Sequence, residues 1–226
     1  MAQVLFLASI WALPVIIAIT LHEAAHGFVA WHLGDDTAKR MGRVTFNPLR
    51  HIDAFGTIIL PALLLLTRAP FLFGWAKPVP VNFGRLHQPR RDMVLVAAAG
   101  PGMNLALAIV SGLLIHPAAL LPSGVSEWAV LNLQNSIVIN VLLAVFNMLP
   151  LPPLDGGRVA VGLLPRELAL PLARLERWGL FILIGLLFIL PLLGEAVGLN
   201  LNIFTWLVGG PFRFLVDAIA TLTGIQ

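Results

Sequence analysis

Long uncharged apolar runs are the feature that most constrains this chain. Residues 4–21 contain no charged side chain, and further apolar segments cover residues 54–67, 93–115, 128–149, 178–193 and 199–215. A helix of about 20 apolar residues crosses the hydrocarbon core of a bilayer. Only 11% of the residues are charged, against about 25% in soluble domains. The pattern predicts an all-α multi-pass membrane protein. It excludes an ordinary soluble enzyme, a disordered chain and a nucleic-acid-binding domain.

Basic residues predict the orientation of the chain in the membrane. Lysine and arginine gather in the stretches 39–50, 68–91 and 158–177, whereas residues 117–127 and 194–198 contain none. Cytoplasmic loops carry an excess of these two residues. We therefore expect the first three stretches in the cytoplasm, and the last two and the N-terminus outside.

Residues 54–67 are flanked by basic stretches on both sides and should not cross the membrane fully. As a helix they would reach about 21 Å, less than the hydrocarbon core of about 30 Å. Pro61 interrupts them, and residues 70–75 offer a short apolar return. We predict a re-entrant hairpin, with a short sixth span as the alternative, and hence about five to six transmembrane helices. Residues 77–82 alternate in a strand-like way and predict a small β element at the membrane edge.

A metal-binding pattern interrupts the first apolar segment. His22 and His26 are four residues apart, with Glu23 between them, so on a helix the two imidazoles project from one face. This spacing lets two histidines bind one Zn²⁺ while the glutamate acts as general base. The chain has no cysteine, so a further ligand must be histidine, aspartate or glutamate. Polar groups inside an apolar helix are costly and indicate function.

Asp155 is the best candidate for the third ligand that catalytic zinc needs. It follows the predicted cytoplasmic end of segment 128–149, and His22 lies about 27 Å along the first segment, also near the cytoplasmic side. Gly156 and Gly157 allow a tight turn that presents the carboxylate. The alternative is a turn-forming Asp-Gly pair without a ligand role.

His22-Glu23-Ala-Ala-His26 in a membrane helix, followed by Asn-Met-Leu-Pro-Leu-Pro-Pro-Leu-Asp-Gly-Gly at 147–157, resembles the site-2 protease family of intramembrane zinc metalloproteases, peptidase family M50. The family's second motif, NxxPxPxLDG, is matched at every fixed position. Residues 74–82 and 99–104 resemble the compact prokaryotic branch, without a PDZ insertion or a CBS pair. The resemblance covers about residues 21–157. We expect one integral membrane protease domain over 1–226, with a catalytic core at about 4–157 and additional transmembrane helices at about 178–216.

The resemblance implies cleavage of transmembrane segments of membrane proteins in a prokaryotic plasma membrane, with one Zn²⁺ per chain and the active site near the cytoplasmic side. Such regulated intramembrane proteolysis acts on membrane-anchored transcriptional regulators or remnant signal peptides. The expected partners are a substrate with a transmembrane segment and the lipid bilayer, and not nucleic acid. The substrate's identity and the oligomeric state stay open.

Three asparagines are candidate substrate-binding residues. Similarity to the family suggests that Asn147 binds substrate or supports the developing oxyanion; a helix–helix hydrogen bond is the alternative. Asn140, seven residues earlier, continues the same polar stripe, and Asn104 closes the segment 99–104. Residues 77–82 are a candidate edge for pairing with an extended substrate.

Two other functions fit the same residues less well. A metal-ion or proton transporter also uses intramembrane histidine, glutamate and aspartate, but it needs neither the His22–Glu23–His26 spacing nor an aspartate at matching depth. An inert relative that binds membrane helices is disfavoured by the intact Glu23.

Overall fold

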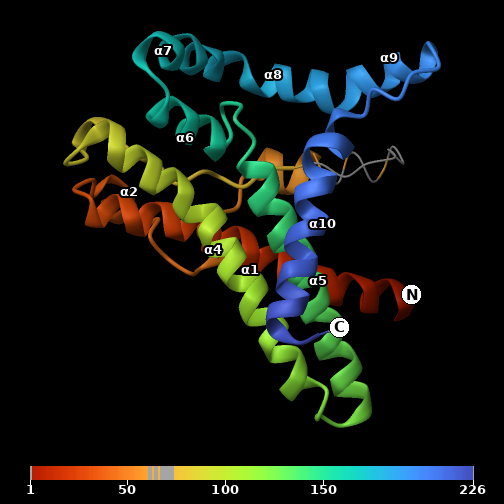
Figure 1. Cartoon of the computed structure of the whole chain (residues 1–226). Helices are drawn as coiled ribbons and strands as arrows, with labels where there is room; N and C mark the ends of the chain where they lie inside the picture. The colour runs from red at the N-terminus through yellow and green to blue at the C-terminus, as the bar shows by residue number, and fades with distance from the viewer. Residues whose placement is uncertain (1, 61–62, 64–65, 67–73, 226) are drawn as a thin grey trace.

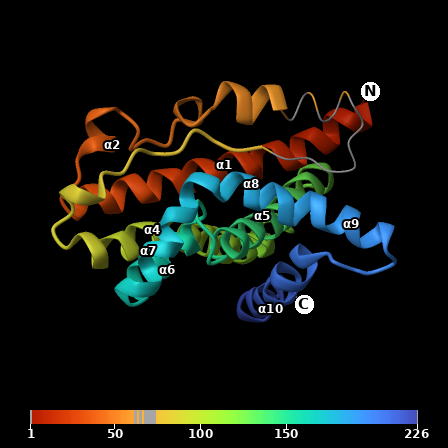
Figure 2. The ribbon, with the colours of Figure 1, turned by 90° about the horizontal axis from the view of Figure 1, so that it is seen from above.

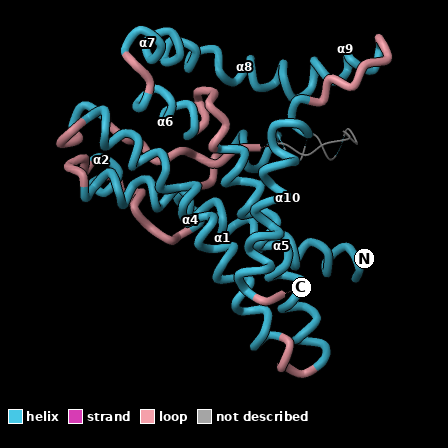
Figure 3. Tube along the Cα trace, viewed as in Figure 1, coloured by secondary structure: helices cyan, strands magenta, loops and turns pink. Residues whose placement is uncertain are grey.

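The computed structural model describes residues 2–60, 63, 66 and 74–225, and within them the chain is helical, with no β-strand (Figures 1 and 3). The longer helices are α1 (Ala2–His32), α4 (Pro89–Ala118), α5 (Ser123–Asn147) and α10 (Ile203–Thr223). The shorter helices are α2 (Thr37–Arg40), η1 (Pro48–Arg50), η2 (Ala54–Ile59), η3 (Phe83–Arg85), α6 (Asp155–Leu163), α7 (Arg166–Arg174), η4 (Leu175–Trp178), α8 (Gly179–Ile184), η5 (Gly185–Ile189) and α9 (Leu190–Ala196).

Helices α1, α4 and α5 pack against one another and form the centre of the molecule. Helix α10 adds to this bundle through a core of aliphatic side chains, in which Ala108 of α4 and Val141 of α5 contact Val208 and Ile219 of α10. Many large apolar side chains elsewhere are exposed. Burial inside the bundle therefore accounts for only part of the apolar surface, as expected for helices that face lipid.

In the described part of the chain, four helical stretches are long and apolar enough to cross a membrane: Leu5–His32, Pro89–Ala118, Ser123–Asn147 and Arg166–Ala196. The prediction of helices at 93–115 and 128–149 is confirmed by α4 and α5. The predicted segment 178–193 falls within the last stretch, which is built from several short helices. The predicted segment 199–215 falls largely in α10, which is not among the four stretches, so the count is below the five to six expected.

Helix α10 runs in the same direction as α4, as its C-terminal contacts show. His116 at the end of α4 shares a hydrogen bond with the carbonyl of Thr223, between Nε2 and O at 2.7 Å. Figure 1 shows α10 descending beside α5 toward the α4–α5 connection. The charge pattern predicts the opposite direction for this segment, because it places residues 194–198 on the same side as 117–127. The prediction used loop charge alone, and the contacts of α10 with α4 overturn it.

The expected re-entrant hairpin is not confirmed. Residues 54–59 form the π-helix η2, but 61–62, 64–65 and 67–73, which include most of the expected apolar return, lie outside the described residues. The predicted β element is not confirmed either. Residues 74–82 are extended but form no strand, and their backbone groups bond to side chains and loops. This extended segment follows α1 closely (Figure 2).

Candidate metal centre

His22 and His26 lie one turn apart on α1, within the candidate span Leu5–His32. Both are buried, with 7% and 8% of their surface exposed. Their rings are roughly perpendicular, with centroids 4.7 Å apart, and their Nε2 atoms are 3.1 Å apart. The helix therefore presents two imidazole nitrogens at one point in the protein interior, as the spacing predicts.

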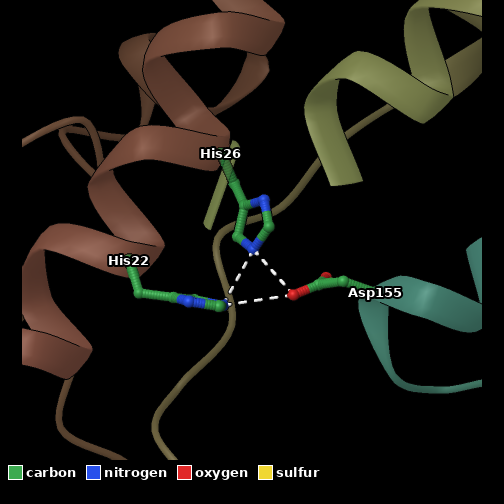
Figure 4. A group of neighbouring side chains, drawn as sticks. All are labelled: His22, His26 and Asp155. Carbon is green, nitrogen blue, oxygen red and sulfur yellow. Dashed lines mark hydrogen bonds and ion pairs between the residues drawn. The ribbon is translucent and has the colours of Figure 1, made fainter. Parts of the chain in front are cut away.

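Asp155 reaches the same point from the opposite side, as Figure 4 shows. It is the first residue of α6, and it follows the tight turn that ends α5. The next two residues must be glycine, because a Cβ on Gly156 would collide with the carbonyl of Met148 and one on Gly157 with the backbone of Pro152. Close backbone packing in this turn thus fixes where the carboxylate points.

The three side chains form a nearly equilateral triangle of ligand atoms. Asp155 Oδ2 lies 3.2 Å from His22 Nε2 and 3.3 Å from His26 Nε2. A tetrahedral ion with ligand bonds of about 2.0–2.1 Å has ligand atoms about 3.3–3.4 Å apart. The triangle therefore has the size of one face of a zinc tetrahedron, in which a catalytic site would keep the fourth corner for water or substrate. Asp155 Oδ2 is buried and, among the described residues, has no hydrogen-bond partner; it faces these two nitrogens instead.

Each imidazole is held through its other nitrogen. His22 Nδ1 lies 2.6 Å from Asn104 Oδ1, and His26 Nδ1 lies 2.7 Å from the carbonyl oxygen of Val96. A carbonyl can only accept, so His26 carries its proton on Nδ1 and turns the lone pair of Nε2 toward the triangle. Partners of this kind orient histidine ligands in metal sites.

Helix α4 closes the centre on a third side, where it passes the two histidines at Gly100. A Cβ on this residue would lie 2.5 Å from His26 Nε2 and 2.6 Å from His22 Nε2, well inside van der Waals contact. Only glycine lets the α4 backbone approach the ligand atoms this closely.

Asp155 lies outside the candidate spans, and its pKa is well below the ordinary value. Burial raises the pKa of this carboxyl, but its close contacts with the imidazoles of His22 and His26 lower it by more. The side chain is thus a carboxylate at neutral pH, the form that binds a metal ion.

Comparisons with known proteins agree with this centre. The profile described as peptidase family M50 matches residues 123–190. YwhC of Bacillus subtilis (strain 168), whose name classes it as a candidate zinc metalloprotease, is 39% identical over 188 residues, which are 80% of this chain and 80% of YwhC. The chain belongs to peptidase family M50. This is the site-2 protease family.

Two further relatives carry names of the same kind. Rip2 of Mycolicibacterium smegmatis (strain ATCC 700084 / mc(2)155) is 30% identical over 76% of this chain and 64% of its own length. Rip2 of Mycobacterium tuberculosis (strain ATCC 25618 / H37Rv) is 33% identical over 79% of this chain and 66% of its own length. The chain thus spans four fifths of YwhC and slightly under two thirds of the Rip2 proteins. No solved structure is significantly similar to the chain.

Glu23, the candidate base of this M50 chain, is partly buried on α1 and is held by the extended segment 74–82. Its Oε2 accepts the backbone N–H of Val79 at 2.8 Å. The guanidinium of Arg43 donates to the carbonyl of Lys77 at 2.7 Å and to that of Pro78 at 3.3 Å. Three backbone groups in the middle of the segment are therefore already engaged by side chains, and the expected pairing of this segment with a substrate strand stays a prediction.

Asp35 anchors the far end of the same segment and was not anticipated from the sequence. It is fully buried and accepts the N–H of Asn82 at 2.6 Å and the hydroxyl and N–H of Thr37 at 2.5 and 3.1 Å. Burial raises the pKa of Asp35, but these hydrogen bonds and the charge of Arg85 lower it by more. The pKa of Asp35 therefore lies below its ordinary value of 3.8. An aspartate at a helix end gives no signal of such a distant partner.

The three candidate substrate-binding asparagines lie in different environments. Asn147 is the last residue of α5, is partly buried, and donates to the carbonyl of Leu143 at 3.0 Å. Asn104 and Asn140 are fully buried between helices, 0% exposed, and bond to each other at 2.8 Å. Both side chains are engaged between helices, and the substrate-binding role expected for them stays a prediction. A single polar residue in an apolar helix shows only that it faces a partner, not which one.

Proposed function

We propose that this protein is an intramembrane zinc metalloprotease that cleaves transmembrane segments of membrane protein substrates, in regulated intramembrane proteolysis. The observation that carries the proposal is the buried triangle of His22 Nε2, His26 Nε2 and Asp155 Oδ2, in which both histidines lie on a helix that is apolar enough to span a bilayer. Membership of family M50 and relatives named as zinc metalloproteases support the same conclusion.

One Zn²⁺ per chain fits this ligand set, since two imidazoles and one carboxylate are a common catalytic zinc site. When bound, the ion polarises the scissile carbonyl and lowers the pKa of a water molecule. His22 and His26 supply neutral nitrogen ligands, and Asp155 supplies the negative charge that offsets part of the charge of the ion.

Glu23 is the residue that moves protons in this proposal. Its Oε2 is engaged by the Val79 N–H, so we assign Oε1 as the oxygen that takes a proton from the attacking water. The same carboxyl group then delivers the proton to the nitrogen of the leaving amine. Asn147, the last residue of α5 before the turn that leads to Asp155, is assigned to substrate contact on the strength of its amide donor alone.

The substrate must present an extended backbone at the centre, because a transmembrane helix uses its carbonyls in its own hydrogen bonds. We place the protein in a prokaryotic plasma membrane as a multi-pass protein, with the centre near the cytoplasmic side. The arginine-rich helices that follow Asp155 support this placement: α7 and η4 contain Arg166, Arg174 and Arg177.

Reconstitution in vesicles tests the proposal against transport by the same residues. The full chain is inserted into liposomes with a tagged peptide that contains one transmembrane segment, and both peptide fragments and zinc entry are followed. We expect cleavage that disappears in Glu23→Gln, with no zinc entry above that of empty liposomes. Zinc entry without cleavage would instead identify a transporter and overturn the proposal.

A further inference from the structure

A chain of side-chain amides crosses the bundle and ends on His22. Asn140 of α5 donates from Nδ2 to the carbonyl of Ser136 at 2.9 Å. Asn104 of α4 donates from Nδ2 to Asn140 Oδ1 at 2.8 Å, and Asn104 Oδ1 meets His22 Nδ1 at 2.6 Å. Three helices that lie side by side in Figure 1 are thus connected through one line of polar groups.

The donor and acceptor atoms in this series of hydrogen bonds are fixed at both asparagines. A backbone carbonyl only accepts hydrogen bonds, so the carbonyl of Ser136 requires the NH₂ group of Asn140 and leaves its Oδ1 facing Asn104. Asn140 Oδ1 also only accepts hydrogen bonds, so the NH₂ group of Asn104 must be the group that faces it. The carbonyl of Ala18, 3.3 Å from Asn104 Nδ2, imposes the same orientation independently. The oxygen of Asn104 must therefore face His22, where it accepts a hydrogen bond from the Nδ1–H group.

We propose that Asn104 is a positioning residue for zinc and that Asn140 holds it in place. Because Asn104 Oδ1 accepts a hydrogen bond from the Nδ1–H of His22, the lone pair of His22 lies on Nε2 and points at His26 and Asp155. This is the tautomer that a metal ion requires. The Val96 carbonyl likewise accepts a hydrogen bond from the Nδ1–H of His26 and so orients that ring. This inference rests on the zinc site proposed above and assigns a role to two buried polar residues that the reaction does not otherwise use.

Because the hydrogen bonds from Asn140 through Asn104 to His22 are buried, removing one of these side chains should have a clear effect on the zinc site. Both asparagines are 0% exposed, so no water replaces a lost partner. Asn104→Leu, similar in size, would leave the Nδ1–H of His22 without an acceptor and free the ring to adopt the other tautomer. Loss of such a partner typically weakens metal binding about 10- to 100-fold. Asn140→Leu should cause a smaller loss, because the carbonyl of Ala18 still orients Asn104.

The full chain in detergent micelles provides the test, with zinc affinity measured by competition with a chelator and ligand geometry by the visible spectrum of the Co²⁺-loaded protein. Asn104→Leu should raise the Kd for zinc about 10- to 100-fold and alter the Co²⁺ spectrum. Asn104→Asp keeps an oxygen for His22 but places a second oxygen against Asn140 Oδ1 and the Ala18 carbonyl, so it should recover only part of the affinity. Asn132→Leu is the matched control, since Asn132 is also buried on α5 but donates to Trp128 on its own helix, and it should bind zinc like the wild type.

The outcomes separate this inference from the proposed function. If His22→Ala binds zinc as tightly as the wild type, the zinc site itself is wrong. If His22→Ala loses zinc while Asn104→Leu keeps wild-type affinity and spectrum, the site stands and the positioning role is wrong. If Asn104→Leu does not fold, Asn140→Leu decides: wild-type affinity in this variant, or the same loss in Asn132→Leu, contradicts the inference.

Discussion

Gly100→Ala tests how tightly the metal centre is built. The added Cβ would lie 2.5 Å from His26 Nε2 and 2.6 Å from His22 Nε2, whereas carbon and nitrogen atoms pack at about 3.5 Å. Either α4 or the two rings must therefore move by about 1 Å. Zinc sites tolerate departures of about 0.2 Å in ligand distance, and a misplacement of about 1 Å costs on the order of 100-fold in catalysis.

We expect Gly100→Ala to lose about 10- to 100-fold in zinc affinity and on the order of 100-fold in cleavage. Zinc content of the purified chain, measured by mass spectrometry of the metal, and chelator competition provide the assay. Gly102→Ala is the control, because a Cβ there, two residues further along α4, meets nothing within 4 Å. Equal zinc affinity in Gly100→Ala and Gly102→Ala would refute the geometry of the centre.

Three other predictions follow from the site and its surroundings. Asp35→Ala should lower the free energy of unfolding by about 2–4 kcal/mol, since the N–H groups of Asn82 and Thr37 and the hydroxyl of Thr37 lose a charged acceptor. Asp36→Ala, which removes only partly exposed ion pairs, should cost about 0–1 kcal/mol, and denaturant unfolding in detergent compares the two. Because the pKa of Asp35 is lowered in the folded protein, its contribution is full above about pH 4 and is lost as the pH falls through the folded-state value; a difference between wild type and Asp35→Ala that grew on acidification would contradict this. Gly156→Ala should cost about 1–3 kcal/mol and reduce zinc content, because the new methyl group meets the carbonyl of Met148; unchanged zinc content would count against the tight turn. Chelation should abolish cleavage, and added zinc should restore it; cleavage that persists in excess chelator would argue against a metalloprotease.

The ligand cluster could be predicted from the sequence because its signals are local. Four-residue spacing places His22 and His26 on one helical face whatever surrounds the helix, and two glycines after Asp155 mark the tight turn. The two apolar segments place these residues at matching depth in the membrane. In the structure the ligand atoms of all three lie within 4.8 Å of one another.

The supporting residues could not be predicted, because their roles depend on the register between helices. Nothing near Gly100 or Asn104 in the sequence says that α4 passes α1 at His22 and His26. The hydrogen bonds from Val79 to Glu23 and from Asn82 to Asp35 join residues 56 and 47 positions apart. Loop charge likewise failed for α10, whose direction is set by packing on α4 and α5.

Cleavage by wild type and Glu23→Gln at equal zinc content tests the central claim most directly. Glu23 is not one of the three ligand residues, so both proteins should hold about one zinc per chain. The account predicts that the wild type cuts a transmembrane peptide and that Glu23→Gln, fully loaded with zinc, cuts it at least about 100-fold more slowly. Equal cleavage rates in the two zinc-loaded proteins would contradict the account.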